Sequence, residues 1–147
     1  MKGMTFLLVQ LESHEDLSRV AHMTTEFSFH GMLDSSGGWD ESFVARYYYV
    51  VEGDVEHGGQ KGVIRIRTRM IEATMEDPAT GSAASALACY IALKSRRTLV
   101  FEIVQGVEMK RKSVIGVEVA LDVEGNKVES VRLSGSAVAV MEGTVRI

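Results

Sequence analysis

The sequence predicts an α+β fold in which an antiparallel, barrel-like sheet wraps around a central buried helix. Two observations lead to this prediction. Most of the chain alternates apolar and polar residues with the two-residue period of half-buried strands. Residues 81–94 are instead apolar on every side of a helix. Because a helix without a polar face has to be enclosed on nearly all sides, we expect the strands to surround it.

The predicted strands are separated by short polar or glycine-rich connections. We expect strands at residues 5–11, 27–32, 43–51, 62–70, 98–105, 113–123, 128–133 and 137–141, a short helix at 14–21, and exposed loops at 34–38 and 53–62. In the second half of the chain, turns at Gly125-Asn126 and Gly135 are tight enough to make the neighbouring strands antiparallel.

Length and composition limit the class of protein. The 147 residues, 1–147, suit a single domain that buries a core without disulfides or a structural metal. The net charge of −4 gives no electrostatic reason to expect binding to nucleic acid or to an anionic membrane. The single cysteine, Cys89, excludes a disulfide framework and fits a reducing compartment, so we expect a cytoplasmic protein. No apolar stretch is long enough for a transmembrane helix.

The segment before the apolar helix, Glu76-Asp77-Pro78-Ala79-Thr80-Gly81-Ser82-Ala83, has the densest chemistry. The first amide N–H groups of a helix have no intrahelical partner and, with the helix dipole, attract an anion. Gly81, Ser82 and Ala83 are small enough for a ligand to reach these amides. Ser82 adds a hydroxyl, and Asp77 could accept a hydrogen bond from the same ligand. The segment therefore predicts a site for a small carboxylate that carries a second polar group.

Two starts of this helix are compatible with the sequence. Asp77 can be the N-cap with Pro78 at the first helical position, a common arrangement that needs no ligand. Thr80 can equally be the N-cap of a helix that starts at Gly81, which would leave the Asp77 carboxylate free. The pattern does not choose between them.

The segment 76–83 resembles the signature of the PhzF-like family of phenazine biosynthesis proteins, relatives of the diaminopimelate epimerases. Further stretches are similar to the family in the same order: 46–50, the strand ending Arg67-Thr68-Arg69-Met70, 105–113, 135–138 and Glu142-Gly143. The resemblance implies a two-lobed protein of roughly twice this length, with each lobe a barrel-like sheet around a helix. Residues 1–147 would then be the carboxy-terminal lobe, without the amino-terminal lobe.

The resemblance also implies an activity. Family members are isomerases that move a proton on a small cyclic or amino carboxylic acid without metal or organic cofactor. The catalytic glutamate and a nearby histidine come from the amino-terminal lobe. The positions of this chain that match the signature make Asp77 and Ser82 the catalytic candidates, and Thr80, Gly81, Ser82 and Ala83 the substrate-binding candidates. On this basis we expect the chain alone to be inactive.

Two departures and two alternatives accompany this assignment. Lys110 and Lys112 stand where the family commonly has Gly and Pro, so the geometry of that turn is open. The lobe could instead be a noncatalytic binding or scaffold module for a small carboxylate. It could also form a homodimer through the face that would meet the missing lobe.

Other chemically interesting side chains have simpler structural explanations. The four histidines, His14, His22, His30 and His57, lack the spacing of metal ligands, so no metal is expected. We expect Cys89 to be a buried structural thiol and Tyr47, Tyr48 and Tyr49 to pack within a strand. Arg65, Arg67 and Arg69 alternate on one strand face, which predicts a solvated or salt-bridged face, or the border of a cleft.

Overall fold

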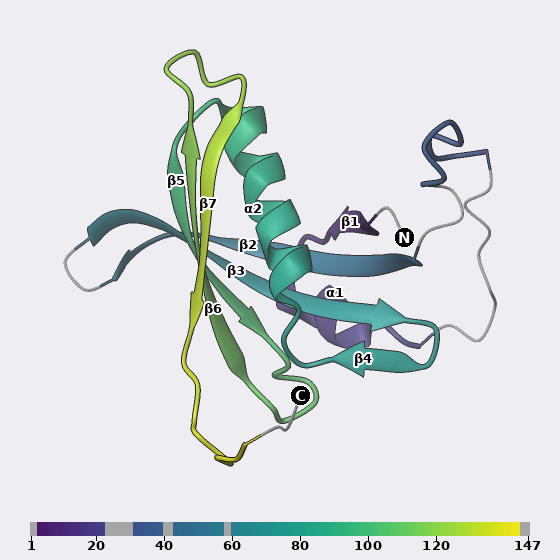
Figure 1. The fold of residues 1–147 in the computed structure, drawn as a ribbon. Coiled ribbons are helices and arrows are strands. Elements are labelled where there is room, and N and C mark those ends of the chain that lie inside the picture. Colours follow the sequence, from purple (N-terminus) through teal and green to yellow (C-terminus); the bar gives the residue numbers. More distant parts are fainter. Residues whose placement is uncertain (1–2, 23–30, 40–42, 58–59, 145–147) are drawn as a thin grey trace.

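The computed structural model describes residues 3–22, 31–39, 43–57 and 60–144, with side chains described outside 54–61. Within these ranges the chain forms seven strands and two helices (Figure 1). In chain order they are β1 (Met4–Gln10), α1 (His14–Arg19), β2 (Phe43–His57), β3 (Gln60–Glu72), β4 (Met75–Asp77), α2 (Gly81–Ser95), β5 (Leu99–Gln105), β6 (Ser113–Leu121) and β7 (Val128–Gly135). The α+β class predicted from the sequence is confirmed.

Most predicted elements are present, with shifted ends. Strands appear where 5–11, 43–51, 62–70, 98–105, 113–123 and 128–133 were predicted. The loop predicted at 53–62 is largely wrong, because β2 extends to His57 and β3 starts at Gln60. The short strand β4 was not predicted. The predicted strand 27–32 lies mainly outside the described residues.

All seven strands belong to one curled sheet of order β1-β2-β3-β5-β6-β7, with β4 paired to β3 beyond the end of β5. The prediction of a purely antiparallel sheet is wrong, because β1 pairs with β2 and β3 with β5 in parallel. In both cases a helix lies between the two strands in the sequence, and such a crossover lets the second strand run in the same direction as the first. The pairs β5–β6 and β6–β7 are antiparallel as predicted.

The helix α2 is not central. It packs along one face of the sheet (Figure 1), and its buried residues are Ala83, Ala84, Leu87, Ala88 and Ala92. On its other side Ser82, Ala86, Tyr90 and Leu93 are exposed, with Tyr90 44% and Leu93 38% accessible. The apolar composition predicted enclosure on all sides, but the described strands curl around only part of the helix. An apolar stripe therefore remains on the surface.

The main core lies between α2 and the sheet. The side chains that alternate toward the helix include Tyr47, Ile66, Phe101, Ile103 and Val117, each 1% accessible or less. On the opposite face of the sheet, the short helix α1 packs with its buried Leu17. Burial of one large apolar side chain contributes about 1.5–3 kcal/mol, so the α2 face provides most of the hydrophobic stabilisation.

The strand predicted at 137–141 is wrong. Gly135 does not turn the chain back but extends β7, opposite Ile115 of β6. Residues 136–144 follow without regular secondary structure, and Val138 and Val140 are 85% and 89% accessible. The alternating pattern of 137–141 is a strand signal, but a strand also needs a neighbour to pair with, and the described part of the chain provides none there.

Candidate active site

The helix α2 begins at Gly81, which decides between the two predicted starts. Thr80 occupies the N-cap position, and the Ala84 amide makes the helical bond to the Thr80 carbonyl at 3.0 Å. The Thr80 side chain makes no capping hydrogen bond. Helix geometry then leaves the amides of Gly81, Ser82 and Ala83 without an intrahelical acceptor. These amides lie at the positive end of a helix of 15 residues.

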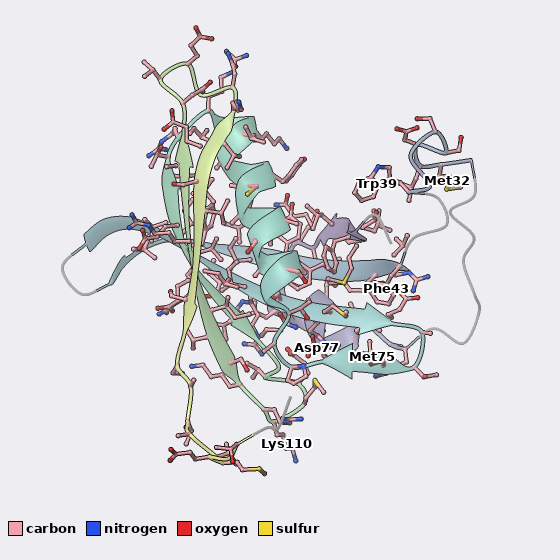
Figure 2. All side chains as sticks on the ribbon, in the orientation of Figure 1. Met32, Trp39, Phe43, Met75, Asp77 and Lys110 are labelled. Carbon is pink, nitrogen blue, oxygen red and sulfur yellow. The ribbon has the colours of Figure 1, made fainter. Side chains whose placement is uncertain are left out.

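Asp77, the last residue of β4, is not the N-cap but belongs to the turn before the helix. One carboxylate oxygen, Oδ1, accepts from the Ala79 amide at 3.2 Å, and Oδ2 accepts from the Thr80 hydroxyl at 2.7 Å. Both carboxylate oxygens of Asp77 therefore accept hydrogen bonds within the turn. The prediction that an N-cap at Thr80 would leave this carboxylate free is wrong. Figure 2 shows Asp77 beside the amino-terminal end of α2.

A buried glutamine, Gln105 at the end of β5, is hydrogen-bonded to this turn. Its Nε2 donates to the Asp77 carbonyl at 2.7 Å and to the Thr80 hydroxyl oxygen at 2.9 Å. Its Oε1 accepts from the Thr80 amide at 3.3 Å and from the Tyr47 hydroxyl at 3.0 Å. Gln105 and Tyr47 are both fully buried. Gln105 begins the family-like stretch 105–113, but the sequence alone predicts no role for it.

The turn that follows Gln105 packs directly against the turn that holds Asp77. Gly106 has a φ of +77°, and a Cβ at this position would lie 2.8 Å from the Pro78 carbonyl oxygen and would collide with the Arg111 carbonyl oxygen. The turn closes through the amides of Lys110 and Arg111, which donate to Val107 and Gly106 at 2.9 Å. Lys110 itself has a φ of +58°, a conformation that favours glycine. The departure at Lys110 therefore keeps the turn and strains its backbone.

A pocket of about 320 Å³ opens beside the start of α2. Its lining residues come from the turn, the helix, β6 and the end of β7: Ala79, Gly81, Ile115, Leu133, Ser134, Gly135 and Ser136. The absence of a side chain at Gly81 makes room for Leu133, since a Cβ there would lie 2.8 Å from Leu133 Cδ2. Sequence reasoning missed Ile115 and Leu133, because only the β6–β7 pairing brings them to the helix.

The predicted site residues are thus brought together at one end of the sheet. Asp77, Thr80 and Gly81 lie in one short segment, and Ser82 is exposed on the first turn of α2. The side chain of Ala83 is fully buried, so only its amide could contact a ligand. This arrangement could bind a carboxylate at the helix amides while Asp77 accepts a hydrogen bond from a neighbouring ligand group.

The comparisons with known proteins concern the family of the chain and not its site residues. A family model described as phenazine biosynthesis-like protein matches residues 1–143. The chain belongs to this family. No curated protein matches it. Membership of the phenazine biosynthesis-like family suggests an isomerase-like function, and it agrees with the resemblance found at 76–83 and 105–113.

The three alternating arginines of this phenazine biosynthesis-like protein form ion pairs on the sheet face opposite α2. Arg65 pairs with Glu102 at 2.6 Å, Arg67 with Glu108 at 2.8 Å, and Arg69 with Glu76 at 2.8 Å. The Glu76 hydrogen bond raises the pKa of Arg69. The guanidinium of Arg69 also donates to carbonyls at the end of α1, namely those of Leu17, Ser18 and Val20. The salt-bridged prediction is confirmed.

The other described candidates lie in the core, against it or next to a glutamate. Tyr47 and Tyr49 are buried in the core, as predicted for packing residues. Cys89 is half-buried against the core, and burial raises the pKa of its thiol, which disfavours the reactive thiolate. His14 lies 2.8 Å from Glu52, and His22 lies 3.7 Å from Glu76. His30 and the His57 side chain are outside the described residues.

Metal-binding clusters and membrane-spanning helices are both absent from the described residues, 3–22, 31–39, 43–57 and 60–144. Across these residues, no cluster of three or more His, Cys, Asp or Glu side chains is arranged to hold a metal ion. Neither α1 nor α2 combines the length and apolar character needed to cross a membrane, and these are the helices found in the described ranges.

Proposed function

We propose that this chain forms one wall of the active site of an isomerase that moves a proton on a small cyclic or amino carboxylic acid. In this proposal the amides of Gly81, Ser82 and Ala83 bind the substrate carboxylate, and Asp77 and Ser82 orient the group next to it. The observation that carries the proposal is the uncapped start of α2 beside the Asp77 carboxylate. The phenazine biosynthesis-like family membership supports the reaction class.

Asp77 is suited to positioning a substrate. Both hydrogen bonds within its turn are accepted by the carboxylate, and each oxygen keeps acceptor capacity for a ligand donor. The bonds from Ala79 and Thr80 hold the carboxylate in one orientation, so a ligand amine or hydroxyl would meet it without further ordering. Pre-organised groups of this kind stabilise a charged transition state because they need little reorganisation during the reaction.

The proton-carrying base would come from a second, amino-terminal lobe. The residues that line the pocket beside α2 are apolar, glycine or serine, so none of them is a conventional general base. In this arrangement 1–147 acts as the carboxy-terminal lobe and supplies binding and orientation. The chain by itself would then bind weakly and turn over little. The same absence of a base in the pocket lining favours the alternative of a noncatalytic carboxylate-binding lobe.

The binding half of the proposal can be tested with a pair of probes that differ by one hydroxyl. Mandelate has a hydroxyl beside its carboxylate, and phenylacetate lacks it. In a titration followed by NMR, both should shift the amide signals of Gly81, Ser82 and Ala83, and neutral phenylacetamide should not. We expect mandelate to bind about tenfold more tightly than phenylacetate, as one hydrogen bond to a charged group allows.

The variant Asp77→Asn should remove most of this preference and leave phenylacetate binding nearly unchanged. Asp122→Asn is the matched control, since Asp122 also accepts backbone amides within a turn, between β6 and β7, and does not line the pocket. Carboxylates that leave the three amides unshifted would refute the site.

For the catalytic half, exchange of the mandelate Cα proton in D₂O should be close to the uncatalysed rate with this chain alone. Exchange that is fast and persists in Asp77→Ala would refute the assignment of roles.

A further inference from the structure

Gln105 connects the core of the protein to both groups of the proposed site. It is fully buried, and all four hydrogen-bonding positions of its side-chain amide are used. Two of its partners fix the orientation of the amide. The Asp77 carbonyl can only accept and the Thr80 backbone amide can only donate, so Nε2 has to face the first and Oε1 the second.

This orientation determines which way the neighbouring hydroxyl donates. Since Gln105 Nε2 donates to the Thr80 hydroxyl oxygen, the Thr80 proton is directed to Asp77 Oδ2, which lies 2.7 Å away. The same amide also holds the Thr80 backbone, whose carbonyl accepts the helical bond from Ala84. One side chain thus sets both the Asp77 carboxylate and the residue from which α2 starts.

Tyr47 orients Gln105 from the opposite side. Its hydroxyl lies 3.0 Å from Gln105 Oε1 and 3.0 Å from Thr68 Oγ1. Because Oε1 carries no hydrogen, Tyr47 donates to it and can accept from the Thr68 hydroxyl. Burial raises the pKa of Tyr47, which keeps this donor protonated. The network runs from the core residue Thr68, through Tyr47 and Gln105, to Thr80 and Asp77.

We propose that Gln105 is a positioning residue of the candidate active site, which holds the Asp77 carboxylate and the first amides of α2 in the relative placement that a ligand requires. Tyr47 acts through Gln105. The inference rests on the proposed function for its effect on ligand binding. Its structural half, the ordering of the turn 77–80 by Gln105, can be measured without any ligand.

The test uses Gln105→Met, which keeps the length of the side chain but makes none of the four bonds, and Tyr47→Phe, which removes a single hydroxyl. Tyr90→Phe, on the exposed side of α2, is the matched control. Hydrogen exchange of the Ala79 and Thr80 amides should become at least about tenfold faster in Gln105→Met and clearly faster in Tyr47→Phe. Exchange of both amides at the wild-type rate in folded Gln105→Met would overturn the proposal.

The ligand readout separates positioning from general destabilisation. At a temperature where urea unfolding shows each variant to be fully folded, the Kd for mandelate should rise about tenfold in Gln105→Met and about threefold in Tyr47→Phe. Adding Tyr47→Phe to Gln105→Met should raise the Kd no further, because Tyr47 acts on the site only through its hydrogen bond to Gln105, which Gln105→Met has already removed. Lower stability with unchanged Kd, or fully additive effects on Kd, would overturn the positioning role.

The two proposals fail in different ways. If mandelate does not shift the Gly81–Ala83 amides of the wild-type chain, the proposed function fails, and the exchange rates of Ala79 and Thr80 still decide whether Gln105 orders the turn. If mandelate binds at these amides and its Kd is unaffected by Gln105→Met, the proposed function stands and the positioning role of Gln105 is wrong. If Gln105→Met does not fold, Tyr47→Phe provides both readouts.

Discussion

Gly106 offers a sharp test of how the two turns of the site depend on each other. In Gly106→Ala the new methyl group would enter a space already bounded by the backbone of Pro78 and Arg111. The positive φ of +77° costs about 1–2 kcal/mol for a residue with a side chain. Because the obstructing atoms are backbone atoms that cannot rotate away, overpacking adds about 1–3 kcal/mol. We therefore expect the free energy of unfolding to fall by about 2–5 kcal/mol.

A matched control separates the two contributions. Gly38 has a similar φ of +69°, and a Cβ there would meet no other atom of the described residues within 4 Å. Gly38→Ala should thus lose only the backbone cost, about 1–2 kcal/mol. Urea unfolding followed by circular dichroism measures both variants, provided that the m-values stay equal. Equal losses in the two variants would refute the close packing of the 106–111 turn against Pro78.

Two further substitutions test strain and charge burial. Lys110→Gly should stabilise the chain by up to about 1 kcal/mol, because glycine relieves the strain of a φ of +58° and loses only part of that gain to the greater entropy of the unfolded chain. Lys110→Ala should not stabilise the chain, and thermal unfolding compares the two variants. Arg69→Met should destabilise by about 3–5 kcal/mol, since it removes the guanidinium that pairs with the buried Glu76 carboxylate at 2.8 Å. The control is Arg132→Met, because Arg132 forms an exposed ion pair with Glu118 at 3.7 Å. It should change the free energy of unfolding by less than about 1 kcal/mol in the same urea assay. Equal losses for the two arginine variants would contradict the burial argument.

The exposed stripe on α2 shows where a sequence pattern stops being informative. Composition alone predicted that residues 81–94 are enclosed, because every side of the helix is apolar. In the described structure Tyr90 and Leu93 are accessible, so the residues that would cover them are not among the strands of this sheet. Periodicity reports which side chains can be buried; it does not report whether a covering layer is present.

The sequence by itself determined the local features of this protein. Strand periodicity located β1, β2, β3, β5, β6 and β7. The segment 76–83 limited the N-cap of α2 to one of two residues, Asp77 or Thr80. These signals suffice because they depend on residues close together in the chain. Family membership was also accessible at this level, since it follows from short motifs in a fixed order.

Only the tertiary structure decided the direction of the strands and the construction of the site. The parallel pairing of β3 with β5 follows from where α2 packs, which no local pattern contains. Tyr47 and Gln105 are 58 residues apart in the chain, yet their hydrogen bond helps to hold the turn of Asp77. Ile115 and Leu133 reach the start of α2 only through the register of β6 with β7. Such contacts join distant residues, and their free energy exists only once the whole sheet has formed.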